Sequence, residues 1–331
     1  RPGRGLGVAA PNNLKAIGFA LVSMGVFATH DVIIKLLGAH YPSLQVLFFS
    51  SLLSFPLVSL ILMQERTPGT LRPQHPGWVA LRSVAATFSG ICGFYAFSAL
   101  PLAQVYAILF ATPLLITLLS IPILGERVGI HRWLAVLLGL CGVLIVLRPG
   151  GGDALSLGHL AALLAALSSA TAAVVTRRLG GGERPLVLLM WPMLGNLVMT
   201  GAGLTLHYVP MELSHLAMAG MIAVLGLTGG FLSILAYRAG EAAIVAPMQY
   251  SQIIWATIYG WYIFDEVLDG PTMIGAGVII ASGLYIVWRE SARRGDTNQP
   301  VIEARLRADT VTTPKSSVLQ RILSGRGNSR Q

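Results

Sequence analysis

Charged residues are scarce in this sequence. They make up 11% of the 331 residues, whereas a soluble domain carries about 25%. Hydrophobic residues account for 54%. So few charges cannot cover the surface of a water-soluble protein of this size. The composition therefore predicts an integral membrane protein, provided that the apolar residues fall in runs long enough to span a bilayer.

Cysteine is almost absent. Cys92 and Cys141 both lie inside apolar runs, so they provide neither a disulfide framework nor the spacing of a metal site. We expect them to pack as small side chains inside helices. The sequence thus predicts no metal and no cofactor.

Signatures of several other protein classes are missing as well. The net charge of +9 comes from basic residues between the apolar runs and in the C-terminal segment, without the aromatic interleaving that nucleic-acid stacking needs. The P-loop motif is absent, and the apolar runs hold no HExxH motif, paired carboxylates or Ser/His/Asp set. We therefore expect no nucleic-acid partner, no drive by ATP and no enzymatic activity.

Ten apolar runs approach the twenty residues that a helix needs to cross a bilayer. They are continuous rather than alternating, and helices satisfy their own backbone in lipid, so we expect an all-α fold. Short connectors rich in Gly, Pro and charge separate the runs. The predicted spans are 14–37, 44–63, 79–98, 102–124, 131–148, 157–178, 185–206, 214–238, 243–263 and 271–289.

Basic residues set the expected orientation of these spans. With the N-terminus in the cytoplasm, Lys35 and Arg148 are the only Lys or Arg residues that fall outside. Cytoplasmic connectors carry an excess of Lys and Arg, which supports this arrangement. The sequence thus places both termini in the cytoplasm and the acidic turn Asp265–Asp269 outside.

An internal repeat divides the apolar region. Two pairs of stretches are similar. One pair is Val143-Leu-Ile-Val-Leu-Arg148 and Leu284-Tyr-Ile-Val-Trp-Arg289, and the other is Lys35-Leu-Leu-Gly38 and Arg177-Arg-Leu-Gly180. Five helices per copy is an odd number, which inverts the second copy in the membrane. We predict one five-helix repeat at 14–148 and a second at 157–289, with a cytoplasmic segment at 1–13 and a basic, disordered cytoplasmic tail at 290–331.

Motifs in both copies resemble those of one known family. The first copy has Phe94-Tyr-Ala-Phe-Ser-Ala-Leu-Pro-Leu-Ala-Gln-Val105 and Leu124-Gly-Glu-Arg127. The second has Val245-Ala-Pro-Met-Gln-Tyr250 and Asp265-Glu266 in place of the more usual Gly-Glu. These stretches are similar to the EamA-type ten-helix members of the drug/metabolite transporter superfamily. The resemblance covers residues 14–290 and implies transport of metabolites: similar proteins export amino acids and related compounds, or take up S-adenosylmethionine or riboflavin.

Asp31 lies inside the first predicted span, four residues before Lys35. A charge within a span is costly, and it faces a cavity or a partner. One interpretation is a site for a proton or for a substrate ammonium group. The other is a local Asp31–Lys35 pair at i,i+4 that neutralises both charges. We predict Asp31 as the proton-coupling residue.

Polar and aromatic side chains from several spans are the candidates for the substrate site. Gln249 and Gln252 of the ninth span share one face with Tyr259. One interpretation is that they bind substrate, and the other is that they form hydrogen bonds that hold helices together. For the aromatic candidates there are two interpretations: they line a pocket, or they pack against neighbouring helices. For Arg82 there are also two: it binds a substrate carboxylate, or it anchors its helix at the lipid headgroups. The predicted substrate-binding residues are Tyr95, Tyr106, Trp191, Asn196, Tyr237, Gln249, Tyr250, Gln252 and Arg82.

Together these features predict a secondary transporter of the inner or plasma membrane, working by alternating access on a small polar or amphipathic metabolite. The turns Leu100–Ala103 and Gly240–Ala243 are its expected gates, and a proton gradient is the expected drive if transport is coupled. The expected partners are the substrate and the lipid bilayer, with the chain a monomer or a weak homodimer. The alternatives are a channel or a non-transporting scaffold and, less favoured, a membrane-embedded enzyme.

Overall fold

The described residues form helices and no strand. A computed structural model describes residues 13–63, 72–125, 129–148, 156–179, 183–205, 207–240 and 242–293. The predicted cytoplasmic segment up to residue 12, the Glu126-Arg127 turn and the tail beyond residue 293 lie outside these ranges. The helices are α1 (Asn13–Gly38), α2 (Ser43–Met63), α3 (Pro76–Ala99), α4 (Leu102–Leu109), α5 (Thr112–Leu124), α6 (Ile130–Leu147), α7 (Leu157–Leu179), α8 (Pro185–Leu204), α9 (Leu213–Ala239), α10 (Ala242–Val245), the 3-10 helix η1 (Ala246–Ser251), α11 (Gln252–Phe264) and α12 (Gly270–Arg293).

Each predicted apolar run is occupied by one helix or by consecutive helices. Within the described residues, seven helical stretches are long and apolar enough to cross a bilayer. The shorter apolar stretches Ser43–Ser59 and Trp133–Leu147 accompany them. The prediction of an all-α membrane protein is confirmed.

Proline breaks two of the runs. In the run 102–124, Pro113 has no N–H to donate to the carbonyl of Leu109, and α4 gives way to α5. The hydroxyl of Thr112 donates to that carbonyl instead, at 2.6 Å. In the run 243–263, Pro247 lies in η1, between α10 and α11. Within a membrane span, backbone groups freed by such a break need another partner.

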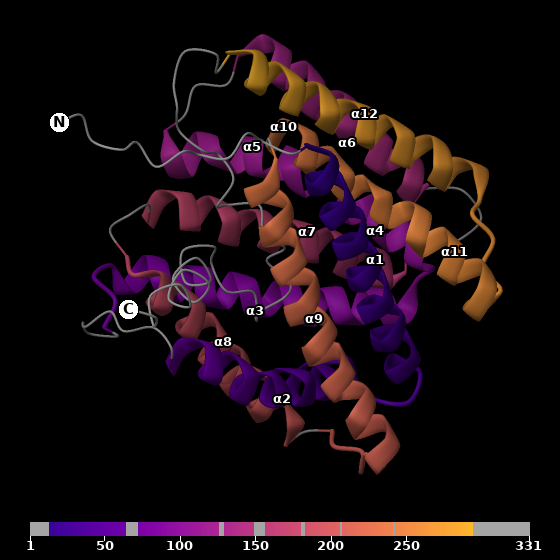
Figure 1. The fold of residues 1–331 in the computed structure, drawn as a ribbon. Helices are drawn as coiled ribbons and strands as arrows, with labels where there is room; N and C mark the ends of the chain where they lie inside the picture. The colour runs from indigo at the N-terminus through magenta and orange to yellow at the C-terminus, as the bar shows by residue number, and fades with distance from the viewer. Residues whose placement is uncertain are drawn as a thin grey trace, which may run out of the picture.

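The helices pack in lengthwise pairs: α1 with α9, α3 with α7, α6 with α12 and α2 with α8 (Figure 1). The α6–α12 pair approaches most closely at Gly142 and Gly275. A Cβ built at Gly275 would lie 2.6 Å from the Gly142 carbonyl oxygen. Small residues let two helices meet backbone to backbone, and this crossing depends on glycine at both positions.

Contacts near the turns between helices define two ends of the bundle. The Lys35 end unites Lys35 with the α3–α4 turn and the α11–α12 turn. The Arg82 end, at the opposite ends of α3, α7 and α8, holds Arg82. Asp31 lies on α1 one turn before Lys35 and is fully buried. The core therefore places this carboxylate between the two ends.

Candidate functional site

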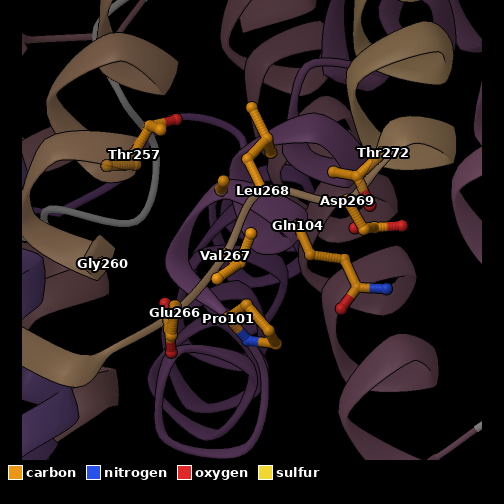
Figure 2. A pocket seen from close by; sticks show the side chains of 11 residues that line it. Pro101, Gln104, Thr257, Gly260, Glu266, Val267, Leu268, Asp269 and Thr272 are labelled. Carbon is orange, nitrogen blue, oxygen red and sulfur yellow. The ribbon is translucent and has the colours of Figure 1, made fainter.

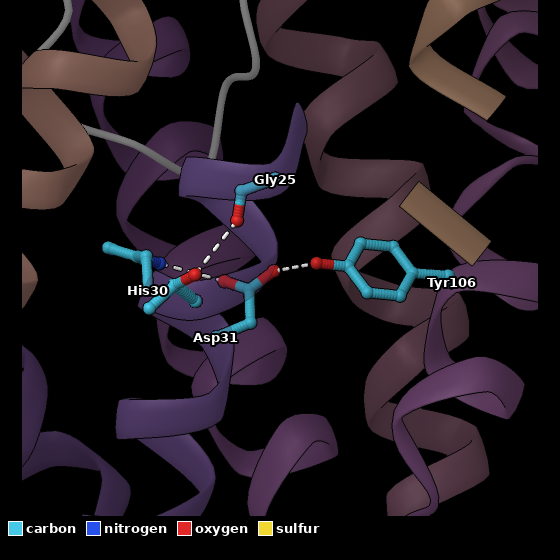
Figure 3. A network of polar contacts seen from close by, with 5 residues as sticks. Gly25, His30, Asp31 and Tyr106 are labelled. Carbon is cyan, nitrogen blue, oxygen red and sulfur yellow. Dashed lines mark hydrogen bonds and ion pairs between the residues drawn. The ribbon is translucent and has the colours of Figure 1, made fainter. Parts of the chain in front are cut away.

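Asp31 is fully buried in α1 and has polar partners on both carboxylate oxygens. Nδ1 of His30 lies 2.8 Å from Oδ1, and the hydroxyl of Tyr106 in α4 donates to Oδ2 (Figure 3). A carboxylate inside a membrane helix costs up to about 3 kcal/mol on insertion scales, and these partners offset part of that cost. Lys35, four residues further along α1, contacts Glu266 and the Leu100 carbonyl.

A second polar contact joins α1 to α11 beside this carboxylate. The Thr29 hydroxyl donates to the Gly25 carbonyl at 2.9 Å, and the Tyr259 hydroxyl lies 3.0 Å from the same Thr29 oxygen. Since Thr29 has one proton to give, Tyr259 is the donor of the second bond. The residues Thr29, His30, Asp31, Tyr106 and Tyr259, here called the Asp31 cluster, thus bring together α1, α4 and α11.

Aromatic rings continue from this cluster toward the second half of the chain. Tyr106 packs edge-on against Phe97 with ring centroids 5.4 Å apart. Phe110 meets Tyr250 of η1 in the same geometry at 5.0 Å. A Cβ at Gly283 would lie 2.1 Å from the Tyr250 hydroxyl, so α12 leaves room for this ring. Tyr106 and Tyr250, both predicted from the sequence, are therefore brought together through Phe110.

At the Lys35 end, an ion pair and its hydrogen bonds join three elements. The ammonium of Lys35 lies 2.7 Å from Oε1 of Glu266 and 2.5 Å from the carbonyl oxygen of Leu100. Oε2 of Glu266 accepts the Leu102 N–H at 3.0 Å, at the start of α4. One carboxylate therefore ties α1, the α3–α4 turn and the α11–α12 turn together.

A small pocket lies beside this ion pair, between the α11–α12 turn and α4. Its walls include Gln104, Glu266, Asp269 and Thr272, and Figure 2 shows Thr272 next to Asp269. Asp269 pairs with Arg148 at the end of α6. Both basic residues expected outside are thus paired with the acidic turn. No group of three His, Cys, Asp or Glu side chains converges to hold a metal ion anywhere in the described ranges.

At the opposite end, Arg82 links three helices. Its Nε donates to the Thr176 hydroxyl of α7 at 2.7 Å, and its Nη1 donates to the carbonyl of Leu188 in α8. Leu188 lies four residues before Pro192, so its carbonyl has lost its helix donor. The Arg82 guanidinium replaces that donor, which gives it a structural task that the sequence interpretation had not considered.

The two halves of the chain match one family separately. The EamA-like transporter family matches residues 14–148 and again residues 156–288. The chain belongs to this family. Family membership and the apolar helices together make it a multi-pass membrane protein, consistent with a bacterial plasma membrane. The predicted family is thereby confirmed.

Curated relatives within the superfamily carry different transport names. The S-adenosylmethionine uptake transporter of Rickettsia bellii is 27% identical over 83% of this chain and 94% of its own. The riboflavin transporter of Rhizobium johnstonii is 29% identical over 85% and 90%. The pseudopaline exporter CntI of Pseudomonas aeruginosa is 25% identical over 80% and 92%. A crystal structure with 18% identity covers 85% of this chain and 98% of its own at a TM-score of 0.55, which supports the fold.

The other predicted substrate residues of this EamA-family chain lie in varied surroundings. Asn196 is fully buried and donates to the Ser51 hydroxyl of α2 at 2.5 Å. Gln252 is buried, and its Nε2 has no hydrogen-bond partner among the described residues. Tyr237 packs near the Arg82 end against the start of α1. Three others lie further out: Tyr95 (39% exposed), Trp191 (43% exposed) and the half-buried Gln249.

Several residues of these sites were not proposed as site residues from the sequence, among them Thr29, His30, Tyr259 and Glu266. Thr29 and Tyr259 bond across α1 and α11, His30 contacts Asp31, and Glu266 pairs with Lys35. The signal for Tyr259 was present, because it shares the face of Gln249 and Gln252. No sequence pattern indicates that Glu266 forms an ion pair with Lys35, which lies 231 residues earlier in the chain.

Proposed function

We propose that this protein is a secondary transporter for a small polar or amphipathic metabolite, with the Asp31 cluster at its substrate and proton site. The observation that carries the proposal is the fully buried carboxylate in α1, bonded by Tyr106 of α4. An ionisable side chain at membrane depth marks a substrate path or a proton relay. Named transporters among the relatives support the same class of activity.

Ten spans in two inverted five-helix repeats, with both termini cytoplasmic, are the proposed topology. In the two repeats α1 corresponds to α7, α2 to α8, α3 to α9 and α6 to α12. If each helix is replaced by its counterpart, the α1–α9 pair becomes the α7–α3 pair, and the α3–α8 contact becomes the α9–α2 contact; all four are present. The pairs α6–α12 and α2–α8 map onto themselves. This exchange symmetry supports the inverted repeat, and carriers of this design rock one half against the other around a site near the midplane.

Because the relatives are named for different substrates, we propose a range of substrates: amino acids and their derivatives, S-adenosylmethionine and riboflavin-like compounds. A proton is the proposed coupling ion, because the Asp31 carboxylate and the His30 imidazole lie together at membrane depth. Substrate binding and proton binding at one carboxylate would exclude each other. That exclusion is the simplest way to couple two fluxes.

Uptake by proteoliposomes tests this function. Purified protein is reconstituted, an acid-inside pH gradient is imposed because competing substrate and proton exchange in opposite directions, and uptake of labelled S-adenosylmethionine, riboflavin and amino acids is followed. We expect the wild type to accumulate at least one of these solutes. Asp31→Asn should lower that rate at least about tenfold, a loss of about 1.4 kcal/mol or more. Equal rates in both proteins would contradict the role of Asp31.

A further inference from the structure

The ammonium of Lys35 occupies a site with three different ligands for an organic cation. The Glu266 carboxylate lies at 2.7 Å and the Leu100 carbonyl oxygen at 2.5 Å. The ring of Phe264 faces the same nitrogen, 5.2 Å from its centroid. Carboxylate, carbonyl and aromatic face are the groups that bind ammonium ligands in proteins.

Glu266 is held in place by groups other than Lys35. Its Oε2 accepts the Leu102 N–H, where the positive end of the α4 dipole stabilises a negative charge. Its own N–H donates to the Gly260 carbonyl at 2.9 Å. A Cβ at Gly260 would lie 2.9 Å from Oε2, so glycine at this position makes room for the carboxylate. The anion therefore stays in position when the lysine leaves.

Glu266 also borders the small pocket, whose volume of about 10 Å³ holds about one water molecule, so a ligand reaches this carboxylate only when the Lys35 end opens. Glu266 forms part of its wall, together with Pro101 and Gln104 (Figure 2). Thr272 lines the same pocket, and its hydroxyl oxygen is buried and has no hydrogen-bond partner in the part of the chain that the structure describes.

We propose that Glu266 is an exchange site for ammonium groups. In the described state Lys35 fills the site and holds the Lys35 end closed. A primary ammonium group of the substrate takes its place when this end opens. This inference deepens the proposed function and rests on it for the identity of the ligand as substrate. It predicts that the protein prefers solutes with a primary amine.

Thermal-shift titration of the purified full chain with n-butylammonium chloride tests the site. Lys35→Met should bind n-butylammonium at least about tenfold more tightly than the wild type, because the competing lysine is gone. The double variant Lys35→Met/Glu266→Gln should lose this gain. Lys35→Arg, which keeps a cation in the site, should behave as the wild type does.

The controls separate the site from ionic strength and from folding. Choline chloride has no N–H to donate and n-butanol no charge, so neither should stabilise Lys35→Met beyond its effect on the wild type. Arg148→Met unpairs Asp269, which is 44% exposed, and should gain less than about twofold because solvent screens that carboxylate. Gel filtration shows which variants are folded.

Two results overturn the inference. One is a folded Lys35→Met without ammonium-dependent stabilisation; the other is a gain that survives Glu266→Gln. The proposed function fails separately: ammonium binding at Glu266 in a protein that moves no solute would contradict transport and support the cation site.

Discussion

At the scale of single residues, the Tyr106 hydroxyl is the group that joins Asp31 to the second helical element of the site. It donates to Oδ2, while its ring packs between Phe97 and Phe110. The ring and the hydroxyl of Tyr106 therefore have separate roles. Packing fixes the position of the helix, and the single O–H offsets the burial of the carboxylate.

Tyr106→Phe keeps the ring and removes the donor. A hydrogen bond to a charged group contributes about 1.5–3 kcal/mol, so we expect transport to fall about tenfold or more in initial rate. Gel filtration and thermal unfolding in detergent serve as the folding control: the variant should run as a single folded species, with a stability loss no larger than that of the lost bond, about 1.5–3 kcal/mol. A wild-type rate in Tyr106→Phe would show that the hydroxyl is not used.

Arg82 and Pro192 make a testable pair at the same scale. Arg82→Met leaves the Leu188 carbonyl unpaired, at a cost of about 1–3 kcal/mol. Pro192→Ala restores the helix donor for that carbonyl, so Arg82→Met should cost about 1 kcal/mol less in the Pro192→Ala background. Unfolding measurements on the four proteins of this double-mutant cycle give the coupling. Additive effects, or lost transport with unchanged stability in Arg82→Met, would favour a substrate role for Arg82.

At the scale of elements, the α6–α12 crossing depends on the absence of two side chains. Gly275→Val places a Cβ within 2.6 Å of the Gly142 carbonyl oxygen, so the helices must separate. We expect a loss of about 1–3 kcal/mol, measured as a lower melting temperature in detergent. Gly277→Val is the matched control on the same helix, because a Cβ there meets nothing within 4 Å. Equal effects of the two substitutions would contradict the close crossing.

The helical elements could be predicted from the sequence, and the contacts between them could be predicted only in part. Continuous apolar runs fix the helices, because lipid leaves the backbone no other partner. Asp31 and Tyr106 stand out as a charge and an aromatic residue in spans. The Lys35–Glu266 pair could not be found in this way, because an i,i+4 partner for Lys35 was available in Asp31. Which partner Lys35 takes depends on how α1 and α11 pack, and spacing along one helix does not contain that information.

At the scale of the whole molecule, the proposed orientation puts the Lys35 end outside and the Arg82 end in the cytoplasm. Cysteine labelling tests it after Cys92 and Cys141 are replaced by alanine. Val267→Cys, at an 82% exposed position of the Lys35 end, should react with a membrane-impermeant maleimide on intact cells. Gly77→Cys, exposed at the other end, should react only after permeabilisation. The reverse pattern would mean the opposite topology.

The most direct test of a carrier built around Asp31 is entrance counterflow. Proteoliposomes preloaded with an unlabelled solute are diluted into the same solute carrying label, with S-adenosylmethionine and riboflavin as the first two solutes. An alternating-access carrier accumulates label transiently above equilibrium without any ion gradient, and we predict this overshoot for the wild type and its loss in Asp31→Asn. Label that only equilibrates, with the same time course in both proteins, would contradict a carrier with Asp31 in its site.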